Sequence, residues 1–243
     1  MPTPYIDLCN QVLRRLNEVE IAPADFAGVR GVQALVKDAV KSSVAKINQA
    51  EFEWPFNAAE HTDTLAAGQE EYVFPADLKS VDYSSFQIQK DDSLGADFKA
   101  LRYLDRDEWY QRHRDEDYAS GAAGRGIPDY VFPAHGSGYG VSPTPDAAYT
   151  LKFRYFLNFS DLAAASDLTR IPSSFDTLIV DGALYHMYMF KDNPESAGVA
   201  FQAFERGLKD LQSIYINNYE YIRDHRVNFG GGRRHGLYGI RNL

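Results

Sequence analysis

The sequence contains very little cysteine, because Cys9 is the only one among its 243 residues. A single thiol cannot form a disulfide within the chain, so the fold does not need an oxidising compartment. Cys9 falls on the apolar stripe of the first predicted helix, where we expect a small core residue. Purely apolar runs stay far below the ~18 residues of a membrane-spanning helix, so no membrane span is expected. Residues 1–5 lack the basic-then-apolar layout of a signal peptide.

Sequence signatures of catalysis and metal binding are also scarce. The histidines are scattered, and no pair has the close helical spacing of a metal site or a cysteine beside it. No serine lies in a G-x-S-x-G elbow, and His113-Arg114-Asp115 imitates a kinase catalytic loop without its downstream Asn. We therefore expect no catalytic, cofactor-binding or metal-ligating residue, no cofactor and no enzymatic activity.

Glycine-rich and acidic segments have simpler explanations than a ligand site. Residues 136–140 lie between two strand patterns, where a hairpin turn is expected, whereas a phosphate-binding loop leads into a helix. No helix follows the glycine-rich residues 121–126 either. Solvated charge in turns, loops and helix starts explains the acidic groups at residues 91–92, 105–108 and 115–117.

Positive charge is scarce over most of the chain and concentrated near its end. The net charge is −9, yet residues 223–243 carry five arginines against Asp224, which leaves −13 on the first 222 residues. An acidic chain is a poor general binder of nucleic acid, because contacts to phosphate dominate that affinity. Aromatic residues make up 14%, with 16 tyrosines, which suits a protein with much contact surface.

Helical periodicity predicts two helices near the start of the sequence. Thr3 is expected to cap the first helix, with Pro4 in its first turn, and Pro23 ends it. The second helix is expected from about Val29 to Phe52. It closes at Trp54-Pro55-Phe56, because a residue before proline avoids the helical conformation.

Two further helices are predicted after Ile171-Pro172. Ser173 and Asp176 have the spacing of a capping box, and His186 within this pattern is expected in a core or an interface. Asn193-Pro194 is expected to cap the last helix. The apolar stripe of that helix consists of Ala197, Phe201, Phe204, Leu208, Leu211 and Tyr215.

The middle of the chain, residues 58–159, shows short strand patterns separated by turn residues. A short helix capped by Asp105 is expected within it. The longest strand pattern places Tyr149, Leu151, Phe153 and Tyr155 on one face. Strands are expected at residues 71–74, 81–89, 130–132, 139–141 and 149–155.

Helices from both ends of the chain need partners for their apolar stripes, and the simplest solution packs them together. We therefore expect an α+β fold, in which a helical bundle from both chain ends holds an inserted antiparallel β module. The expected boundaries are residues 1–57 and 166–222 for the bundle, 58–165 for the β-rich module and 223–243 for an extended C-terminal arm.

The C-terminal arm interleaves its arginines with large apolar side chains, which are unfavourable in water. A segment that folds onto a partner when it binds explains this composition. Two alternatives remain for the arm, namely a terminus without a role and an arm that binds nucleic acid.

Several local motifs follow one another in a fixed order. The second helix ends in an aromatic cluster at residues 54–56, and a hairpin leads to residues 72–77, Tyr-Val-Phe-Pro-Ala-Asp. Pro128-Asp129-Tyr130 and residues 143–146, Pro-Thr-Pro-Asp, precede the long strand. Residues 171–175, Ile-Pro-Ser-Ser-Phe, then open a helix that reaches Gly182-Ala183.

In this order and spacing the chain resembles the head-to-tail adaptor (connector) proteins of tailed phages, of the tail tubular protein A-like group. The resemblance covers about residues 3–220, and the chain departs from the group in its 115–127 loop and its Gly/Arg tail. It implies a structural virion protein that forms a ring, dodecameric in that group, between the portal and the tail. The lumen of the ring then serves as the channel through which the genomic DNA is ejected.

The resemblance also implies the partners and the location of the protein. The partners are further copies of the chain, the portal protein and a tail tube or nozzle protein, with no membrane. The expected location is the head-tail junction of the virion, after synthesis in the host cytoplasm. A head-to-tail interface closes into a ring when the rotation between neighbouring subunits divides a full turn evenly. An acidic lumen would repel the DNA backbone and let the DNA slide.

In similar adaptors a C-terminal segment docks on the portal, which suggests that role for the arm here. The portal-binding residues expected on this ground are Phe229, Arg233, Arg234, Leu237, Tyr238 and Ile240. Another tail or connector component, such as a stopper or tail-completion protein, is the main alternative. An unrelated enzyme or nucleic-acid-binding protein is the other.

Overall fold

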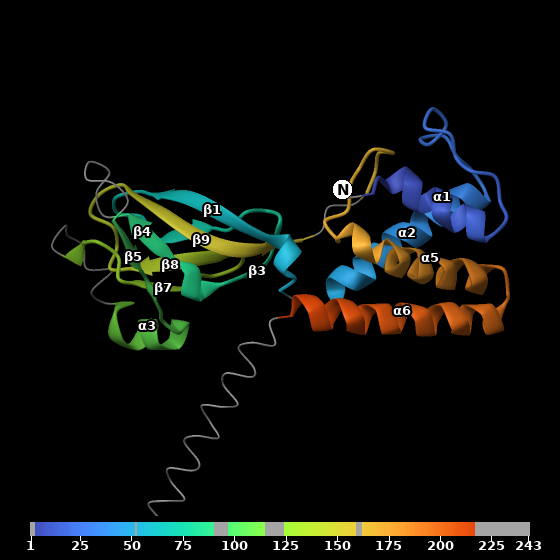
Figure 1. The fold of residues 1–243 in the computed structure, drawn as a ribbon. Coiled ribbons are helices and arrows are strands. Elements are labelled where there is room, and N and C mark those ends of the chain that lie inside the picture. Colours follow the sequence, from blue (N-terminus) through green and yellow to red (C-terminus); the bar gives the residue numbers. More distant parts are fainter. Residues whose placement is uncertain (1–2, 52, 90–96, 115–123, 159–161, 217–243) are drawn as a thin grey trace, which may run out of the picture. The chain divides into compact units, whose positions relative to one another are not determined.

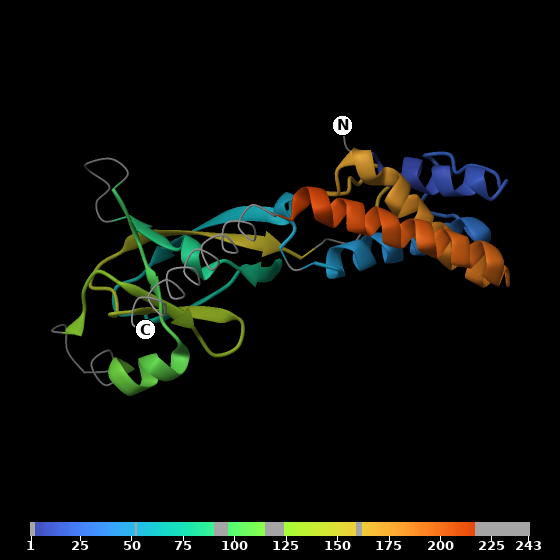
Figure 2. The same ribbon diagram turned by 60° about the horizontal axis from the view of Figure 1, so that its bottom comes forward.

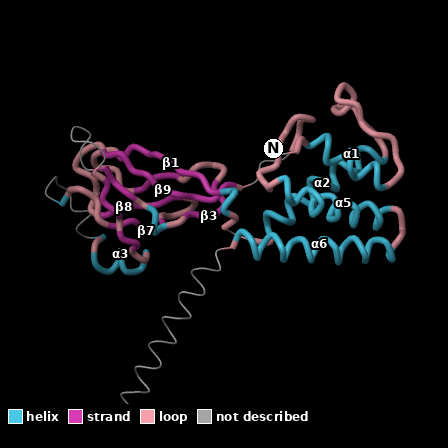
Figure 3. The backbone as a smooth tube through the Cα atoms, viewed as in Figure 1, coloured by secondary structure: helices cyan, strands magenta, loops and turns pink. Residues whose placement is uncertain are grey.

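The computed structural model describes residues 3–51, 53–89, 97–114, 124–158 and 162–216. The chain divides into two compact units, Met1–Phe56 with Asp161–Leu243 and Asn57–Ser160. The first unit is helical and the second is rich in strands (Figures 1 and 3). The expected α+β fold is confirmed, with a helical bundle from both chain ends and a β module between them. The expected arm lies outside the described residues.

The helical unit is organised around one central helix, α5. This helix contacts α1, α2 and α6, and Figures 1 and 2 both show it lying along α6. The helices are α1 (Tyr5–Arg15), α2 (Val32–Gln49), α5 (Asp176–Phe190) and α6 (Pro194–Tyr215), with short 3-10 turns η1 (Pro55–Asn57) and η4 (Ser173–Phe175).

α5 is central because its sequence is apolar almost all the way round. Such a helix cannot present one face to water and must be covered on several sides. Its neighbours come from both ends of the chain, so the two ends must fold together. The buried residues of α5 are Leu178, Ile179, Val180, Gly182, Ala183, Leu184 and Met187.

Gly182 lets α2 and α6 approach α5 closely. A Cβ atom at this position would lie 2.2 Å from Ser43 Oγ of α2 and 2.7 Å from the Phe204 ring of α6. Both distances are shorter than real Cβ contacts, so only glycine fits between these two neighbours. Gly207 of α6 is less crowded, with Leu178 at 3.1 Å from its hypothetical Cβ.

An aromatic cluster closes the end of the bundle where α2 and α6 both finish. Trp54 is fully buried, and its Nε1 donates a hydrogen bond to the Ile47 carbonyl at 2.9 Å. Its ring stacks on Phe56 at 5.2 Å, and Phe56 meets Tyr215 edge-on at 5.8 Å. The second helix was expected to reach Phe52 and to close at residues 54–56, but α2 already ends at Gln49, and the aromatic cluster lies beyond its end.

The start of α1 is held by the segment that precedes α5. The backbone N–H groups of Tyr5 and Ile6 donate to the carbonyls of Asp167 and Ala165, at 2.8 and 3.1 Å. These bonds satisfy donors that a helix N-terminus otherwise leaves open. Inside α1, Cys9 is fully buried, as predicted.

Two expected helix caps are wrong, and one interaction explains both. Thr3 does not cap α1 and Ser173 does not cap α5, which begins only at Asp176. Instead the Thr3 hydroxyl donates to the Asp176 carboxylate, so the two groups bond to each other across the bundle. By contrast, Asn193 caps α6 as predicted, with its Oδ1 accepting from Ser196 N at 3.1 Å.

The described residues of the β-rich unit form two sheets. One has the order β1-β9-β4-β5, with β3 also paired to β9, and the other has the order β2-β8-β7-β6. All pairs are antiparallel except β6 with β7, a parallel pair that the pattern did not predict. The strands are β1 (Ala58–Leu65), β2 (Glu71–Val73), β3 (Leu78–Val81), β4 (Gln87–Gln89), β5 (Phe98–Ala100), β6 (Arg102–Tyr103), β7 (Tyr130–Pro133), β8 (Gly138–Ser142) and β9 (Tyr149–Leu157).

β9 carries the core of this unit, because it pairs with β1, β3 and β4. Its predicted apolar face is confirmed: Leu151 and Phe153 are almost fully buried, and Phe153 stacks on Phe86 with ring centroids 4.5 Å apart. The buried Tyr139 packs on the same cluster and donates from its hydroxyl to Asp63 Oδ2 at 2.7 Å.

The glycine-rich residues 136–140 form a hairpin, as predicted, and two of them are suited to glycine for different reasons. Gly136 has a positive φ of 72° in the turn between β7 and β8. Gly140 lies against the Phe132 ring, which a Cβ would reach at 2.3 Å.

Trp109 of the short helix α3 (Arg106–Arg112) stacks on Phe132 at 4.4 Å. Asp105 caps α3 as expected, accepting from Asp107 N at 3.3 Å.

One predicted strand is wrong, and strands β1, β5 and β6 were not predicted. Residues 81–89 do not form a single strand, because Asp82 caps a 3-10 turn, η2 (Tyr83–Ser85), that separates β3 from β4. β1 was missed because its sequence is mostly polar. No helix within the described part of the chain is long and apolar enough to cross a membrane.

Replacing Gly182 with alanine tests the central packing of α5. We expect Gly182→Ala to destabilise the helical unit by about 1–3 kcal/mol, because the added methyl overpacks the contact with Ser43 and Phe204. Gly198→Ala on α6 is the matched control, since nothing lies within 4 Å of its hypothetical Cβ. That control should be neutral or stabilise by up to about 1 kcal/mol. Urea unfolding followed by circular dichroism measures both, and equal stability of the two variants would contradict the packing.

Candidate interaction surfaces

The histidines of the described residues do not belong to a metal-binding cluster. No group of three His, Cys, Asp or Glu side chains in this part of the chain is placed to hold a metal ion. His61 packs against the rings of Phe153 and Tyr155, at 5.2 and 6.2 Å, and His113 packs against Tyr130 at 5.4 Å. These histidines therefore take part in aromatic packing.

Burial shifts the pKa of three other titratable groups. Burial raises the pKa of the Cys9 thiol to about 12, although the charge of Lys37 opposes this. Burial likewise raises the pKa of Tyr139, and its hydrogen bond to Asp63 adds to the effect. His186 is half-buried on α5. Burial is the larger cause that lowers its pKa, and the positive charge of Lys46 lowers it further.

The portal-binding residues expected from the sequence, Phe229, Arg233, Arg234, Leu237, Tyr238 and Ile240, lie outside the described residues. The acidic groups at 91–92 and 115–117 do as well. The described acidic group, 105–108, belongs to the start of α3, where Glu108 pairs with Arg112 at 2.7 Å. Asp105 caps α3 and Glu108 pairs within it, so the charges of this group stabilise the helix.

A groove of about 650 Å³ runs along the helical unit, and we call it the helical groove. Its floor is one side of α5, formed by Asp181, Leu184 and Tyr188. One wall is Arg15 of α1, and the other wall is the first three turns of α6. The residues of the α6 wall are Glu195, Ser196, Val199, Ala200 and Ala203.

The helical groove combines apolar surface with charges at its edge. The side chain of Val199 is 70% exposed, although it lies in a folded helix. Arg15 donates to Asp181 at 2.6 Å, which holds α1 against α5. Among the described residues, Glu195 has no ion pair. An apolar groove with a polar edge is typical of a protein-binding surface.

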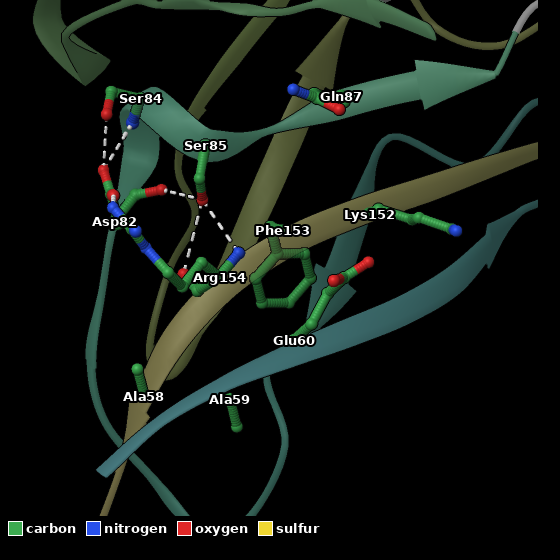
Figure 4. Close-up of a pocket in the computed structure, with 10 residues that line it drawn as sticks. All are labelled: Ala58, Ala59, Glu60, Asp82, Ser84, Ser85, Gln87, Lys152, Phe153 and Arg154. Carbon is green, nitrogen blue, oxygen red and sulfur yellow. Dashed lines mark hydrogen bonds and ion pairs between the residues drawn. The ribbon is translucent and has the colours of Figure 1, made fainter. Parts of the chain in front are cut away.

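A second groove, of about 540 Å³, lies on the β-rich unit (Figure 4). Its floor is β9, one side is the start of β1, and the other side is η2 with the beginning of β4. Figure 4 shows Asp82, Ser84, Ser85 and Arg154 gathered at one end, and Glu60 with Lys152 at the other. Acidic side chains, basic side chains and hydroxyl groups all line it, so this groove is polar.

Asp82 organises the polar end of that groove. Its carboxylate accepts from Ser84 N at 3.1 Å and from Ser84 Oγ at 2.6 Å, and it pairs with Arg154. Ser85 Oγ accepts from Arg154 N at 2.8 Å and donates to the Asp82 carbonyl at 2.6 Å. Burial acts to raise the pKa of Asp82, but the hydrogen bonds from Ser84 and Arg154 outweigh it, and the pKa lies below its usual value.

Neither groove was predicted from the sequence, because each combines residues far apart in the chain. Arg15, Asp181 and Glu195 meet in the helical groove, and Glu60, Asp82 and Arg154 meet in the polar one. One local signal was present. Val199 and Ala203 are apolar yet fall outside the predicted buried stripe of α6, which indicates a second apolar face.

The sequence model of a family described as SU10 adaptor protein matches residues 3–227. The match therefore includes both the helical and the β-rich unit. No curated protein matches the sequence.

The Asp82 network should make a small, pH-dependent contribution to stability. Because folding lowers the pKa of Asp82, its contribution is complete above the unfolded pKa of about 4 and is lost as the pH falls through the folded pKa. We expect Asp82→Asn to cost up to about 1 kcal/mol at pH 7, since Arg154 is largely exposed.

The difference from wild type should shrink as the pH falls below about 4. Glu60→Gln in the same groove is the control and should show a smaller effect. Urea unfolding at a series of pH values measures both variants, and a difference for Asp82→Asn that grows in acid would contradict the assignment.

Proposed function

The chain belongs to the SU10 adaptor protein family, which is a family of phage adaptor proteins, and from this premise we propose its position and assembly in the virion. We infer that it forms a ring of identical subunits, dodecameric as in similar adaptors, between the portal and the tail. DNA passes through the lumen of this ring. The partners are further copies of the chain, the portal protein and a tail tube or nozzle protein.

The family match is the observation that carries this proposal. It confirms the phage adaptor expected from the sequence motifs, a structural component of the virion rather than a member of an enzyme family. It does not name the tail tubular protein A-like group, which stays a prediction. The match spans both units, so the proposal concerns the whole described chain.

The charge of the chain supports passage of DNA through the ring. The first 222 residues carry −13, so a ring built from them is acidic overall. A DNA backbone near an acidic surface is repelled and keeps its counterions, so it slides without sticking.

The arm is the proposed portal-binding element. The proposed contacts are those of Phe229, Arg233, Arg234, Leu237, Tyr238 and Ile240. Residues 223–243 carry a net charge of +4, which suits an acidic groove on the partner, and their apolar side chains supply the buried contact. A segment of about 20 residues spans up to roughly 60 Å when extended. It can therefore reach beyond the unit to which it is attached.

Mass measurement in the presence of the purified portal tests the proposed position. We expect the wild-type chain to add directly to the portal as one large ring of identical subunits. A stopper or tail-completion protein would instead bind only after another tail protein has been added. Absence of any complex with the portal, with or without other tail proteins, would contradict both assignments.

Deletion of residues 226–243 tests the arm. We expect at least a tenfold loss of portal binding and an unchanged circular dichroism spectrum, because the last described helix, α6, ends at Tyr215. The control variant, Arg170→Ala with Lys209→Ala, removes two exposed positive charges from the helical unit and should keep its binding. Portal binding that survives the deletion would remove this role of the arm.

A further inference from the structure

We propose that two copies of the free chain join through strand β1, whose open edges pair antiparallel about Thr62. The occupant of the edge is a second copy of this chain. Both copies use the same surface, so the contact is two-fold and its product is a pair. A ring needs contacts between two different surfaces, so this pair belongs to the free protein and does not depend on the proposed function.

β1 is an edge strand with one side unpaired. Among the described strands it pairs only with β9, and it runs along the border of the β-rich unit (Figure 1). All of its residues, Ala58–Leu65, pair with β9 in one continuous register. Natural edge strands often carry a bulge, a proline or a lysine, which keep other chains from pairing with them. β1 has none of the three, so its edge is a template for another strand.

The free side of β1 presents the backbone groups of every second residue. Arg154 of β9 lies opposite Glu60, but its N–H donates to Ser85 Oγ at 2.8 Å on the other side of β9. The backbone of Arg154 therefore points away from β1. Hydrogen-bonded and non-hydrogen-bonded pairs alternate in an antiparallel ladder. The N–H and C=O groups of Glu60, Thr62 and Thr64 therefore point to the free edge.

These edge groups are open at the middle of the strand. No hydrogen bond among the described residues uses the N–H or C=O groups of Glu60 or Thr62. At Thr64 the N–H already donates to Asp63 Oδ1 at 2.8 Å, so only the carbonyl of Thr64 is open. Pairing about Thr62 suits this pattern, because the Glu60 N–H of one copy then meets the open Thr64 carbonyl of the other.

The side chains of β1 select the same register. With Thr62 opposite Thr62 of the other copy, His61 lies opposite Asp63. Threonine pairs and pairs of opposite charge are favourable cross-strand neighbours. A slip by two residues would set His61 against His61 or Asp63 against Asp63, and a slip by one residue would turn the side chains to the wrong face.

His61 and Asp63 are both able to make the contact. Each lies on the core side of the sheet and is only partly buried. The ring of His61 packs on aromatic side chains of β9, and its nitrogens make no hydrogen bond with a described residue. Asp63 accepts one bond at each oxygen, from Tyr139 and from Thr64 N. A carboxylate accepts up to about four bonds, so Asp63 can also accept one from His61 of the other copy.

The outer face of β1 brings no like charges together. Glu60 lies opposite Thr64 of the other copy, so the two Glu60 residues are about 13 Å apart along the strands. Glu60 also lies beside Lys152 at one end of the polar groove (Figure 4). The charge of Glu60 therefore does not oppose the pairing.

The contact is small, so the pair should dissociate on dilution. A standard protein interface buries about 800 Å² per partner, and a single edge strand supplies only part of that area. We therefore expect the free chain to pair at concentrations of about 10–100 µM and to separate below them. Analytical ultracentrifugation over a dilution series, without portal, measures this equilibrium.

Thr62→Pro tests the edge. The Thr62 N–H points away from β9, so proline removes a donor from the edge and no bond from the sheet. We expect Thr62→Pro to weaken pairing by roughly tenfold or more. Val73→Pro is the matched control on β2, an edge strand of the other sheet. The Phe74 N–H donates to the Ser137 carbonyl, so by alternation the Val73 N–H also points outward, and this control should pair like wild type.

Single cysteines test the register. In a hydrogen-bonded antiparallel pair the Cα atoms lie about 5.5 Å apart, a distance that a disulfide spans. We expect Thr62→Cys alone to give a disulfide-linked pair in a glutathione redox buffer. Glu60→Cys and Thr64→Cys should each give little product alone and should link to each other when mixed. Cys9 does not compete, because burial raises the pKa of its thiol to about 12.

The outcomes separate this contact from the proposed function. If the wild-type chain stays single throughout the dilution series and Thr62→Cys gives no linked pair, the pairing of β1 is wrong and the adaptor function stands. If Thr62→Pro pairs as tightly as wild type, another surface joins the copies and the proposal is overturned. If Glu60→Cys links to itself while Thr62→Cys does not, the register about Thr62 is wrong. Should Thr62→Pro lose its circular dichroism spectrum, the cysteine variants decide alone.

Discussion

Burial of α5 by helices from both ends of the chain is the interaction on which the rest of this structure depends. α5 is apolar on nearly every side, and α1, α2 and α6 cover most of it. Gly182 sets how closely α2 and α6 approach, because no side chain fits between Ser43 and the Phe204 ring. Since α1 and α2 precede the β-rich unit and α5 and α6 follow it, this burial also makes the β-rich unit an insertion.

The same packing leaves one side of α5 uncovered. The neighbours of α5 leave this side open, and it is the floor of the helical groove. Val199 stands exposed beside it. An exposed apolar groove with a polar edge is typical of a surface that another protein covers.

Much of the fold could be predicted from the sequence, where local chemistry decides the structure. The alternation of Tyr149 to Tyr155, the cap at Asn193 and the turn at Gly136 each depend on neighbouring residues only. The prediction failed where distant residues decide. Thr3 and Asp176 bond to each other, so Thr3 does not cap its helix. In β1, the polar side chains of His61 and Asp63 are partly buried because they have partners in other strands. His61 packs against the rings of Phe153 and Tyr155, and Asp63 accepts a hydrogen bond from Tyr139. The grooves were beyond prediction for the same reason, since their walls come from separate helices or strands.

Electron microscopy of the chain assembled on its portal tests the central claim most directly. The account predicts a closed ring of identical subunits in which α5 of each subunit is covered by α1, α2 and α6 of the same chain. It also predicts that the arm of each subunit contacts the portal. A chain that stays a single subunit on the portal, or a ring whose subunits leave the portal untouched, would contradict the account.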